Sequence, residues 1–182
     1  MNSKQRGVLR GMLAGACFAL MIVGAGICLN PFDFPAELDH AARLDVAMAS
    51  VLWPVFFLAV AIGRLAGHRF FTPEDIDGGG LTAGTGRARL LQTLLQNTLE
   101  QCVLAFGVYC AWAVLMPSAW LSVVPMAALA FVAGRLLFFM GYQKGAPSRA
   151  FGFTLSFYPS LAMLLCIAVF MGARLFMPQT IS

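Results

Sequence analysis

The chain has 182 residues, of which 60% are hydrophobic and only 11% are charged, with a formal net charge of +4 at pH 7. A soluble domain carries about 25% charged residues, so this composition excludes an ordinary soluble protein. The basic residues are spread along connecting segments instead of forming one patch with interleaved aromatics, which excludes a nucleic-acid-binding protein.

Five apolar runs are each long enough to cross a bilayer as a helix, for which about 20 residues are needed. The runs cover approximately residues 8–29, 46–66, 91–116, 119–141 and 154–177. The sequence therefore predicts an all-α integral membrane protein.

The first run, residues 8–29, has two interpretations. Its basic start and the segment Val23-Gly24-Ala25 resemble a secretory signal peptide. We expect a retained membrane helix instead. Gly7, Gly11 and Gly15 stand four residues apart, which predicts a flat face for close helix packing. The alternative is that these glycines reflect only their general frequency in membrane helices.

The distribution of Lys and Arg predicts the orientation, because these residues are enriched in cytoplasmic connections. The 30–45 connection is mainly acidic, whereas the N-terminus and the 67–90 and 142–153 connections are basic. An N-terminus in the cytoplasm places every basic connection on the cytoplasmic side. We expect a bacterial-type inner membrane protein in this orientation.

The 67–90 connection contains the longest hydrophilic stretch of the chain. Thr72-Pro73-Glu74-Asp75 has the order of a helix cap followed by a first turn, so a short helix or turn is predicted there. The glycine-rich continuation lacks the Gly-Lys-Ser/Thr ending of a phosphate-binding loop. His68, before this stretch, is interpreted as a hydrated or headgroup-facing residue.

Asn97, Glu100 and Arg135 lie inside two of the apolar runs, and an ionisable residue inside a bilayer indicates a functional site by default. Asn97 and Glu100 are three residues apart and share one helix face. Measured from the cytoplasmic ends of their helices, Glu100 and Arg135 lie at similar depths, about 17 Å and about 13 Å. We therefore predict a contact between Glu100 and Arg135 that neutralises both charges.

Further polar residues are expected at the same cytoplasmic level, namely Arg64, Tyr142 and Arg149. The arginines outnumber the acids there, which favours a pocket for an anionic ligand with carboxylates. The alternative is an ion pair that only fixes the helix register. The sequence offers no nucleophile and no metal-ligating cluster, and the five cysteines are interpreted as packing residues. An enzyme of this kind would receive its nucleophile from the ligand.

The order and spacing of these motifs resemble the MAPEG family, the membrane-associated proteins of eicosanoid and glutathione metabolism. The segment 96–100 resembles the N-x-x-E element of that family's second helix. Gly134-Arg135, followed by Tyr142, resembles the G-R…Y element of its third helix. Ala146-Pro147-Ser148-Arg149 is similar to the A-P-x-R stretch that follows it, and Arg64 also has a counterpart.

The resemblance covers about residues 46–177 and implies a MAPEG-like four-helix bundle. Residues 8–29 have no counterpart in the four-helix fold and are interpreted as one additional N-terminal transmembrane helix. We therefore divide the chain into residues 1–45, the extra helix with an acidic outer loop, and residues 46–182, the membrane domain. The family also implies a homotrimer, with glutathione bound between neighbouring subunits near the cytoplasmic face.

The resemblance assigns roles by position. The residues that would bind glutathione are Arg64, Asn97, Glu100, Arg135 and Tyr142. Arg149 would be catalytic, because it would hold the glutathione sulfur as a thiolate.

The sequence departs from the family pattern at three positions. Thr93 stands where the family often has arginine, and Phe138 and Phe153 stand where some members have tyrosine. Fewer donors would weaken a glutathione site.

The function expected first is a glutathione-dependent transferase or peroxidase. It would act on a lipophilic electrophile or hydroperoxide that arrives from the bilayer. One alternative is a non-catalytic lipid-binding or scaffold protein of the same fold. Another is an accessory subunit of a membrane complex. The sequence does not identify the electrophile, and it does not decide between glutathione and another thiol.

Overall fold

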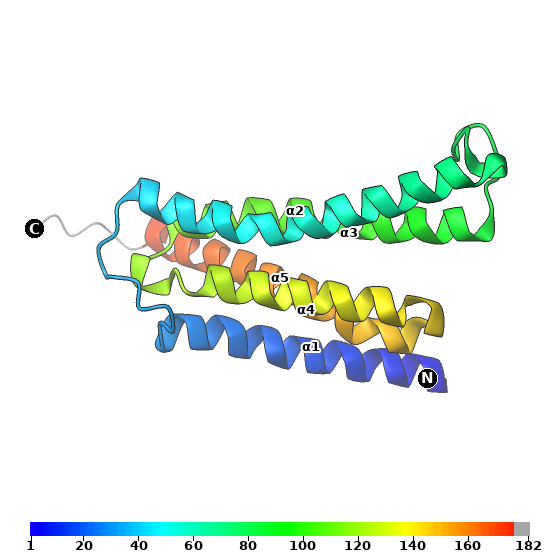
Figure 1. Ribbon diagram of the computed structural model, residues 1–182. Helices are drawn as coiled ribbons and strands as arrows, with labels where there is room; N and C mark the ends of the chain where they lie inside the picture. The colour runs from blue at the N-terminus through cyan, green and yellow to red at the C-terminus, as the bar shows by residue number, and fades with distance from the viewer. Residues whose placement is uncertain (177–182) are drawn as a thin grey trace, which may run out of the picture.

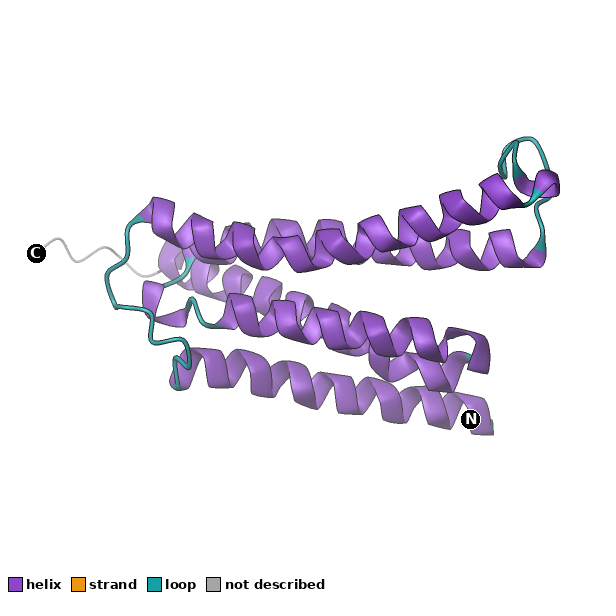
Figure 2. Cartoon of the chain, viewed as in Figure 1, coloured by secondary structure: helices purple, strands orange, loops and turns teal. Residues whose placement is uncertain are grey.

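The computed structural model describes residues 1–176, which fold into five long helices joined by short connections (Figures 1 and 2). The long helices are α1 (Ser3–Cys28), α2 (His40–Phe71), α3 (Gly86–Leu115), α4 (Val123–Gly141) and α5 (Ala146–Phe176). Three single-turn 3-10 helices lie between them: η1 (Pro73–Asp75), η2 (Ser118–Trp120) and η3 (Tyr142–Lys144). Five helical segments are long and apolar enough to cross a membrane, so the chain is an all-helical integral membrane protein.

The five predicted spans are confirmed, and most of the helices extend beyond the apolar runs. The clearest difference is α5, which begins at Ala146 and not near residue 154. Pro147 is the second residue of this helix, where the missing N–H group leaves no hydrogen bond unmade. The short helix predicted after Thr72 is confirmed as η1.

The helices form three neighbouring groups. Figure 1 shows α2 and α3 as one long antiparallel pair, α4 and α5 beside them, and α1 on the far side of α4 and α5. Helix α1 packs mainly against α5, and α2 packs mainly against α3. The additional N-terminal helix therefore covers the last helix of the chain.

The glycine face of α1 makes this packing close. A Cβ atom added to Gly11 would lie 2.9 Å from the Cβ of Ala150, so only glycine fits there. The hydroxyl of Thr154 donates a hydrogen bond of 3.1 Å to the carbonyl oxygen of Gly11. Gly7 and Gly15 also leave no room for a side chain against α5. The predicted face for close helix packing is confirmed.

The N-terminus, the connection between α2 and α3, and η3 lie at one end of the molecule (Figure 1). Helix α2 consists of 32 residues. At about 1.5 Å per residue, it is about 48 Å long. The hydrocarbon core of a bilayer is only about 30 Å thick. Figure 1 shows that the α2–α3 pair projects beyond the rest of the molecule at that end. The polar residues described next lie towards the same end.

Candidate functional site

Arg135 is the most deeply buried charged residue of the described chain, with an exposed fraction of 0%. Its guanidinium donates one hydrogen bond of 3.0 Å to Oδ1 of Asn97, on α3. It donates two more, of 2.7 and 3.2 Å, to Oγ of Ser156, on α5. The Ser156 hydroxyl in turn donates to Oε1 of Gln101 at 2.7 Å. Arg135 thus joins α3, α4 and α5 through neutral oxygen atoms.

The predicted contact between Glu100 and Arg135 is wrong for the single chain. Glu100 is exposed and accepts a hydrogen bond of 2.9 Å from the side chain of Gln96. It lies about 4.5 Å beyond Asn97 along α3, and Ser156 occupies the second side of the guanidinium. Within residues 1–176 the one ion pair joins His68 and Asp75.

A groove of about 350 Å³ lies beside this buried network. Three of the predicted site residues line it, namely Asn97, Tyr142 and Arg149. The remaining lining residues are Val8, Met12, Thr93, Phe138, Ala146, Ala150, Phe153, Thr154 and Tyr158. The walls of the groove therefore come from α1, α3, α4, η3 and α5.

Arg149 lies in the first turn of α5 and lines the groove. Its guanidinium carbon is 4.2 Å from the centre of the Tyr142 ring, and the Tyr142 ring contacts Phe138 edge to face. No carboxylate of residues 1–176 lies within 4.0 Å of its guanidinium nitrogens. A cation at the start of a helix opposes the helix dipole, so an anion in the groove would be favoured there.

The other predicted site residues take different positions. Arg135 does not line the groove, and it acts on the groove through the side chain of Asn97. Arg64 is exposed on α2, with its guanidinium carbon 5.5 Å from the centre of the Phe139 ring. Arg64 and Glu100 both lie outside the groove of the single chain.

Two sets of residues near the groove carry no recognisable signal in the sequence. Ser156 accepts two hydrogen bonds from Arg135 and donates one to Gln101. A lone polar residue inside an apolar helix gives no sequence signal for its partner. Val8 and Met12 form part of the groove wall. The pattern of α1 indicated close packing, but it did not indicate which helix α1 would cover.

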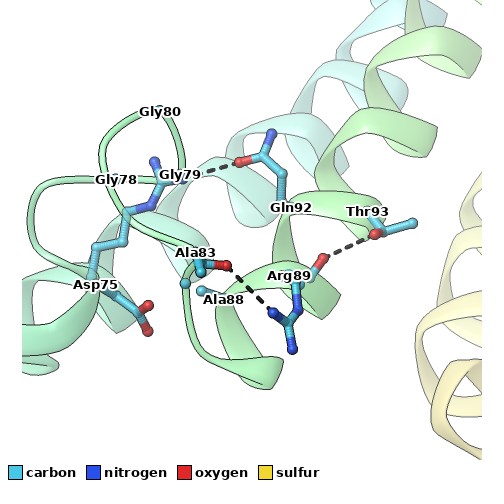
Figure 3. A pocket seen from close by; sticks show the side chains of 11 residues that line it. Asp75, Gly78, Gly79, Gly80, Ala83, Ala88, Arg89, Gln92 and Thr93 are labelled. Atoms are coloured by element: carbon cyan, nitrogen blue, oxygen red, sulfur yellow. Dashed lines mark hydrogen bonds between the residues drawn. The ribbon is translucent and has the colours of Figure 1, made fainter.

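A larger cavity, of about 780 Å³, lies at the glycine-rich connection between α2 and α3 (Figure 3). Its polar side chains are already engaged with the protein. Arg69 donates to Gln92 at 3.2 Å, and Arg89 donates to the carbonyl of Ala83 at 3.4 Å (Figure 3). Thr93 is shared between this cavity and the groove. We interpret the cavity as the interior of a folded connection.

Asp75 holds this connection together. Its carboxylate is buried and accepts hydrogen bonds from the hydroxyl of Thr85 at 2.6 Å and from the Thr85 backbone N–H at 2.7 Å. These hydrogen bonds, together with His68 at 2.9 Å, lower the pKa of Asp75 below its usual value. The interpretation of His68 as a hydrated or headgroup-facing residue is therefore wrong, since η1 turns Asp75 back onto it.

Comparison with known proteins identifies the family of this chain. A model of the MAPEG family matches residues 46–169, which run from the first turns of α2 into α5. The match leaves α1 outside. No curated protein and no solved structure matches the chain.

Proposed function

The chain belongs to the MAPEG family, and on this basis we propose that it is a glutathione-dependent transferase or peroxidase. Its substrates would be lipophilic electrophiles or hydroperoxides in the membrane. The observation that carries this proposal is Arg149, a cation without a carboxylate partner among the described residues, in one groove with Tyr142 and Asn97.

The residues of the groove fit glutathione. The groove has a volume of about 350 Å³. This volume falls within the usual range for small-molecule sites. Glutathione carries two carboxylates and a thiol, and the groove offers donors from the guanidinium of Arg149 and the amide of Asn97. Oδ1 of Asn97 accepts a hydrogen bond from Arg135, so the amide N–H groups of Asn97 remain available to the ligand.

The chemistry that glutathione supplies is nucleophilic attack by sulfur. A thiol has a pKa of about 8.5 and is mostly protonated at neutral pH. A guanidinium beside the sulfur favours the thiolate. In the transfer reaction the S–H bond breaks and an S–C bond forms. In a substitution the bond from that carbon to the leaving group breaks, the leaving group takes the electron pair, and the thiol proton passes to it or to solvent. In an addition a C=C π bond breaks, and the thiol proton ends on the neighbouring carbon. In the peroxidase reaction one hydroperoxide and two thiols give one alcohol, one water and one disulfide.

Each residue of the site has a separate role in this proposal. Arg149 is the catalytic residue, since it would contact the sulfur. Tyr142 supports the guanidinium of Arg149 with the face of its ring. Arg135 is a positioning residue, because it fixes the amide of Asn97 from within the protein.

We also propose a homotrimer in which Arg64 and Glu100 complete the site of a neighbouring subunit. Both are exposed in the single chain although they belong to apolar helices. A charged side chain that faces lipid is costly, and a subunit interface would cover it. Native mass spectrometry in mild detergent is expected to detect three copies, and a monomer alone would contradict this.

The membrane and its orientation belong to the same proposal: a bacterial-type inner membrane, with the N-terminus and the α2–α3 connection in the cytoplasm. The excess of Lys and Arg at that end of the molecule supports it. A cysteine introduced at Gly79 would then resist an impermeant thiol reagent in intact cells. Rapid labelling in intact cells would contradict the proposed orientation.

The activity is tested with purified protein, glutathione, and either 1-chloro-2,4-dinitrobenzene or cumene hydroperoxide. Turnover is expected for the parent and is expected to fall in Arg149→Ala. Arg87→Ala is the matched control, because Arg87 is exposed at the same end and does not line the groove. Equal turnover in both variants would remove Arg149 from the reaction.

One observation favours a second function, a non-catalytic lipid-binding or scaffold protein. Thr93 lines the groove where the resemblance leads us to expect an arginine, so the groove has one cation fewer. Lipid binding without any binding of glutathione would support this function over the enzyme.

A further inference from the structure

The N-terminal helix α1 lies outside the region that matches the family, yet it forms a wall of the groove. We infer that α1 and α5 together bind the long alkyl chain of a single-chain lipid substrate. The reactive end of this lipid would lie beside Arg149. The inference rests on the proposed function for the chemistry of the substrate, and on the structure for its place.

A second hollow, of about 390 Å³, runs between α1 and α5 and is almost entirely apolar. It is lined by Leu9, Met12, Leu13, Ala16, Ala19, Leu20, Tyr158, Leu161, Ala162 and Leu165. Met12 and Tyr158 line both this hollow and the groove that contains Arg149. The polar groove and the apolar hollow therefore adjoin each other at these two side chains.

The burial of the lining residues gives the hollow the form of a channel. The small residues Ala16, Ala19 and Ala162 are buried or half-buried and form its floor, whereas Leu13 and Leu165 are exposed and form its rims. From Arg149 to Leu165 the channel follows α5 for about 24 Å. This length suits one extended alkyl chain.

The volume of the channel and the cation at one end of it favour one kind of ligand. The hollow has a volume of about 390 Å³, which is too small for a helix of a second copy, since a helix is about 10 Å wide with its side chains. An amphiphile with one chain and one polar end matches both parts, because Arg149 and Tyr142 stand at one end and leucines at the other.

The channel has a fixed width, because α1 cannot move relative to α5 without losing close contacts. Gly11 packs directly on Ala150, and the hydroxyl of Thr154 donates a hydrogen bond to the carbonyl of Gly11.

Two alanines of α1 offer a matched pair of positions for substitution. Ala14 and Ala16 flank the neighbouring Gly15 on opposite sides of the helix, about 100° away in each direction. Ala16 lines the channel, whereas Ala14 does not.

The first experiment maps binding without glutathione. The full chain in lipid nanodiscs is irradiated with palmitic acid that carries a terminal diazirine, and the labelled peptides are identified. Because the diazirine is at the end of the chain that lies far from Arg149, labels are expected on residues 19–20 and 161–165. Ala16→Trp should reduce this labelling about tenfold, because displacing about two methylenes from the channel costs that much affinity. Ala14→Trp, the matched control, should leave it unchanged.

Two outcomes of the labelling would overturn the inference. One is equal labelling in both tryptophan variants. The other is equal labelling of the same peptides by a phospholipid with the diazirine on its chain, since bulk lipid would then fill the channel. Melting curves report whether Ala16→Trp folds, and Ala16→Leu serves as a milder block.

The second experiment separates the channel from the proposed function. Ala16→Trp should raise the KM for linoleic acid hydroperoxide about tenfold. Turnover of the compact cumene hydroperoxide should remain at the level of the parent. Absence of any turnover in the parent would overturn the proposed function alone, and the labelling result would still decide the channel. Equal effects on both hydroperoxides would overturn the channel alone.

Discussion

The guanidinium carbon of Arg149 lies 4.2 Å from the centre of the Tyr142 ring, so the cation rests on the face of the aromatic group. The ring limits the motion of the guanidinium and shields one of its faces from solvent. Its N–H groups point outward from the edge of the guanidinium plane and stay available to a ligand in the groove.

Arg149→Ala is expected to lose the glutathione thiolate. The ultraviolet absorbance of a thiolate should appear when glutathione is added to the parent and should be absent in the variant. Turnover should fall by about 10–100-fold, which corresponds to a thiol pKa higher by about one to two units. Arg149→Lys should retain part of the signal, because lysine keeps the charge but not the planar stacking. A thiolate signal of equal size in Arg149→Ala would contradict the assignment.

Tyr142 is expected to act through its ring. Tyr142→Phe keeps the aromatic face and should retain turnover. Tyr142→Ala removes the cation–π interaction with Arg149, which contributes about 0.5–1 kcal/mol, and should lower turnover. The measurement is kcat/KM with glutathione as the varied substrate. A large loss in Tyr142→Phe would show that the hydroxyl binds the ligand directly.

Replacement of Arg135 should separate stability from ligand binding. Arg135→Met retains most of the volume and leaves no cavity, so its cost should be limited to about 1–2 kcal/mol for the unpaired oxygens of Asn97 and Ser156. Arg135→Ala leaves a cavity and exposes the unpaired oxygens of Asn97 and Ser156, and should cost about 3 kcal/mol. Both variants should bind glutathione more weakly, since Asn97 is no longer fixed. Calorimetric binding at the parent level in Arg135→Met would exclude the positioning role.

The glycine face of α1 predicts a position-dependent response to larger side chains. Gly15→Val would force a side chain into Thr154. This overpacking should destabilise the protein by about 1–3 kcal/mol. Gly24→Val, in the same helix, meets no atom within 4 Å and should not destabilise it. Thermal unfolding in detergent compares the two, and equal melting temperatures would mean that α1 is not docked on α5.

The α2–α3 connection should resist acid, and the sign follows from Asp75. The pKa of Asp75 is lowered in the folded state. In the unfolded chain an aspartate has a pKa of about 3.9. The stabilisation is therefore complete well above the unfolded pKa and is lost as the pH falls through the lower, folded value. Limited proteolysis within residues 76–84 should be slow at neutral pH and fast in Asp75→Asn. Rapid cleavage of the parent near pH 5 would contradict this.

The sequence predicted the helices well because long apolar runs leave the backbone few alternatives in a bilayer. It also placed Asn97, Tyr142 and Arg149 at one level, and the structure brings these three into one groove. The prediction that Glu100 contacts Arg135 was wrong for a geometric reason. Depth along a helix can be counted in residues, but the direction of a side chain depends on how the helices rotate against one another.

The contribution of α1 to the groove also could not be predicted from the sequence. Apolar residues such as Val8 and Met12 have no chemical signature that distinguishes a lipid-facing position from a ligand-facing one. The interaction of His68 with Asp75 was missed for a related reason. The turn of η1 decides whether that carboxylate points into water or back onto α2, and residue type alone does not specify this.

The hydrogen bond between Thr154 and Gly11 joins residues 143 positions apart in the chain. Both the groove and the apolar channel are closed by this pairing of the first long helix with the last. During synthesis, α1 leaves the ribosome well before α5 exists, so neither cavity can form until translation is nearly complete. The first helix must wait beside an unfinished bundle with its glycine face uncovered. The groove and the channel therefore form only after α5 has been synthesised, and a chain that ends before α5 lacks both.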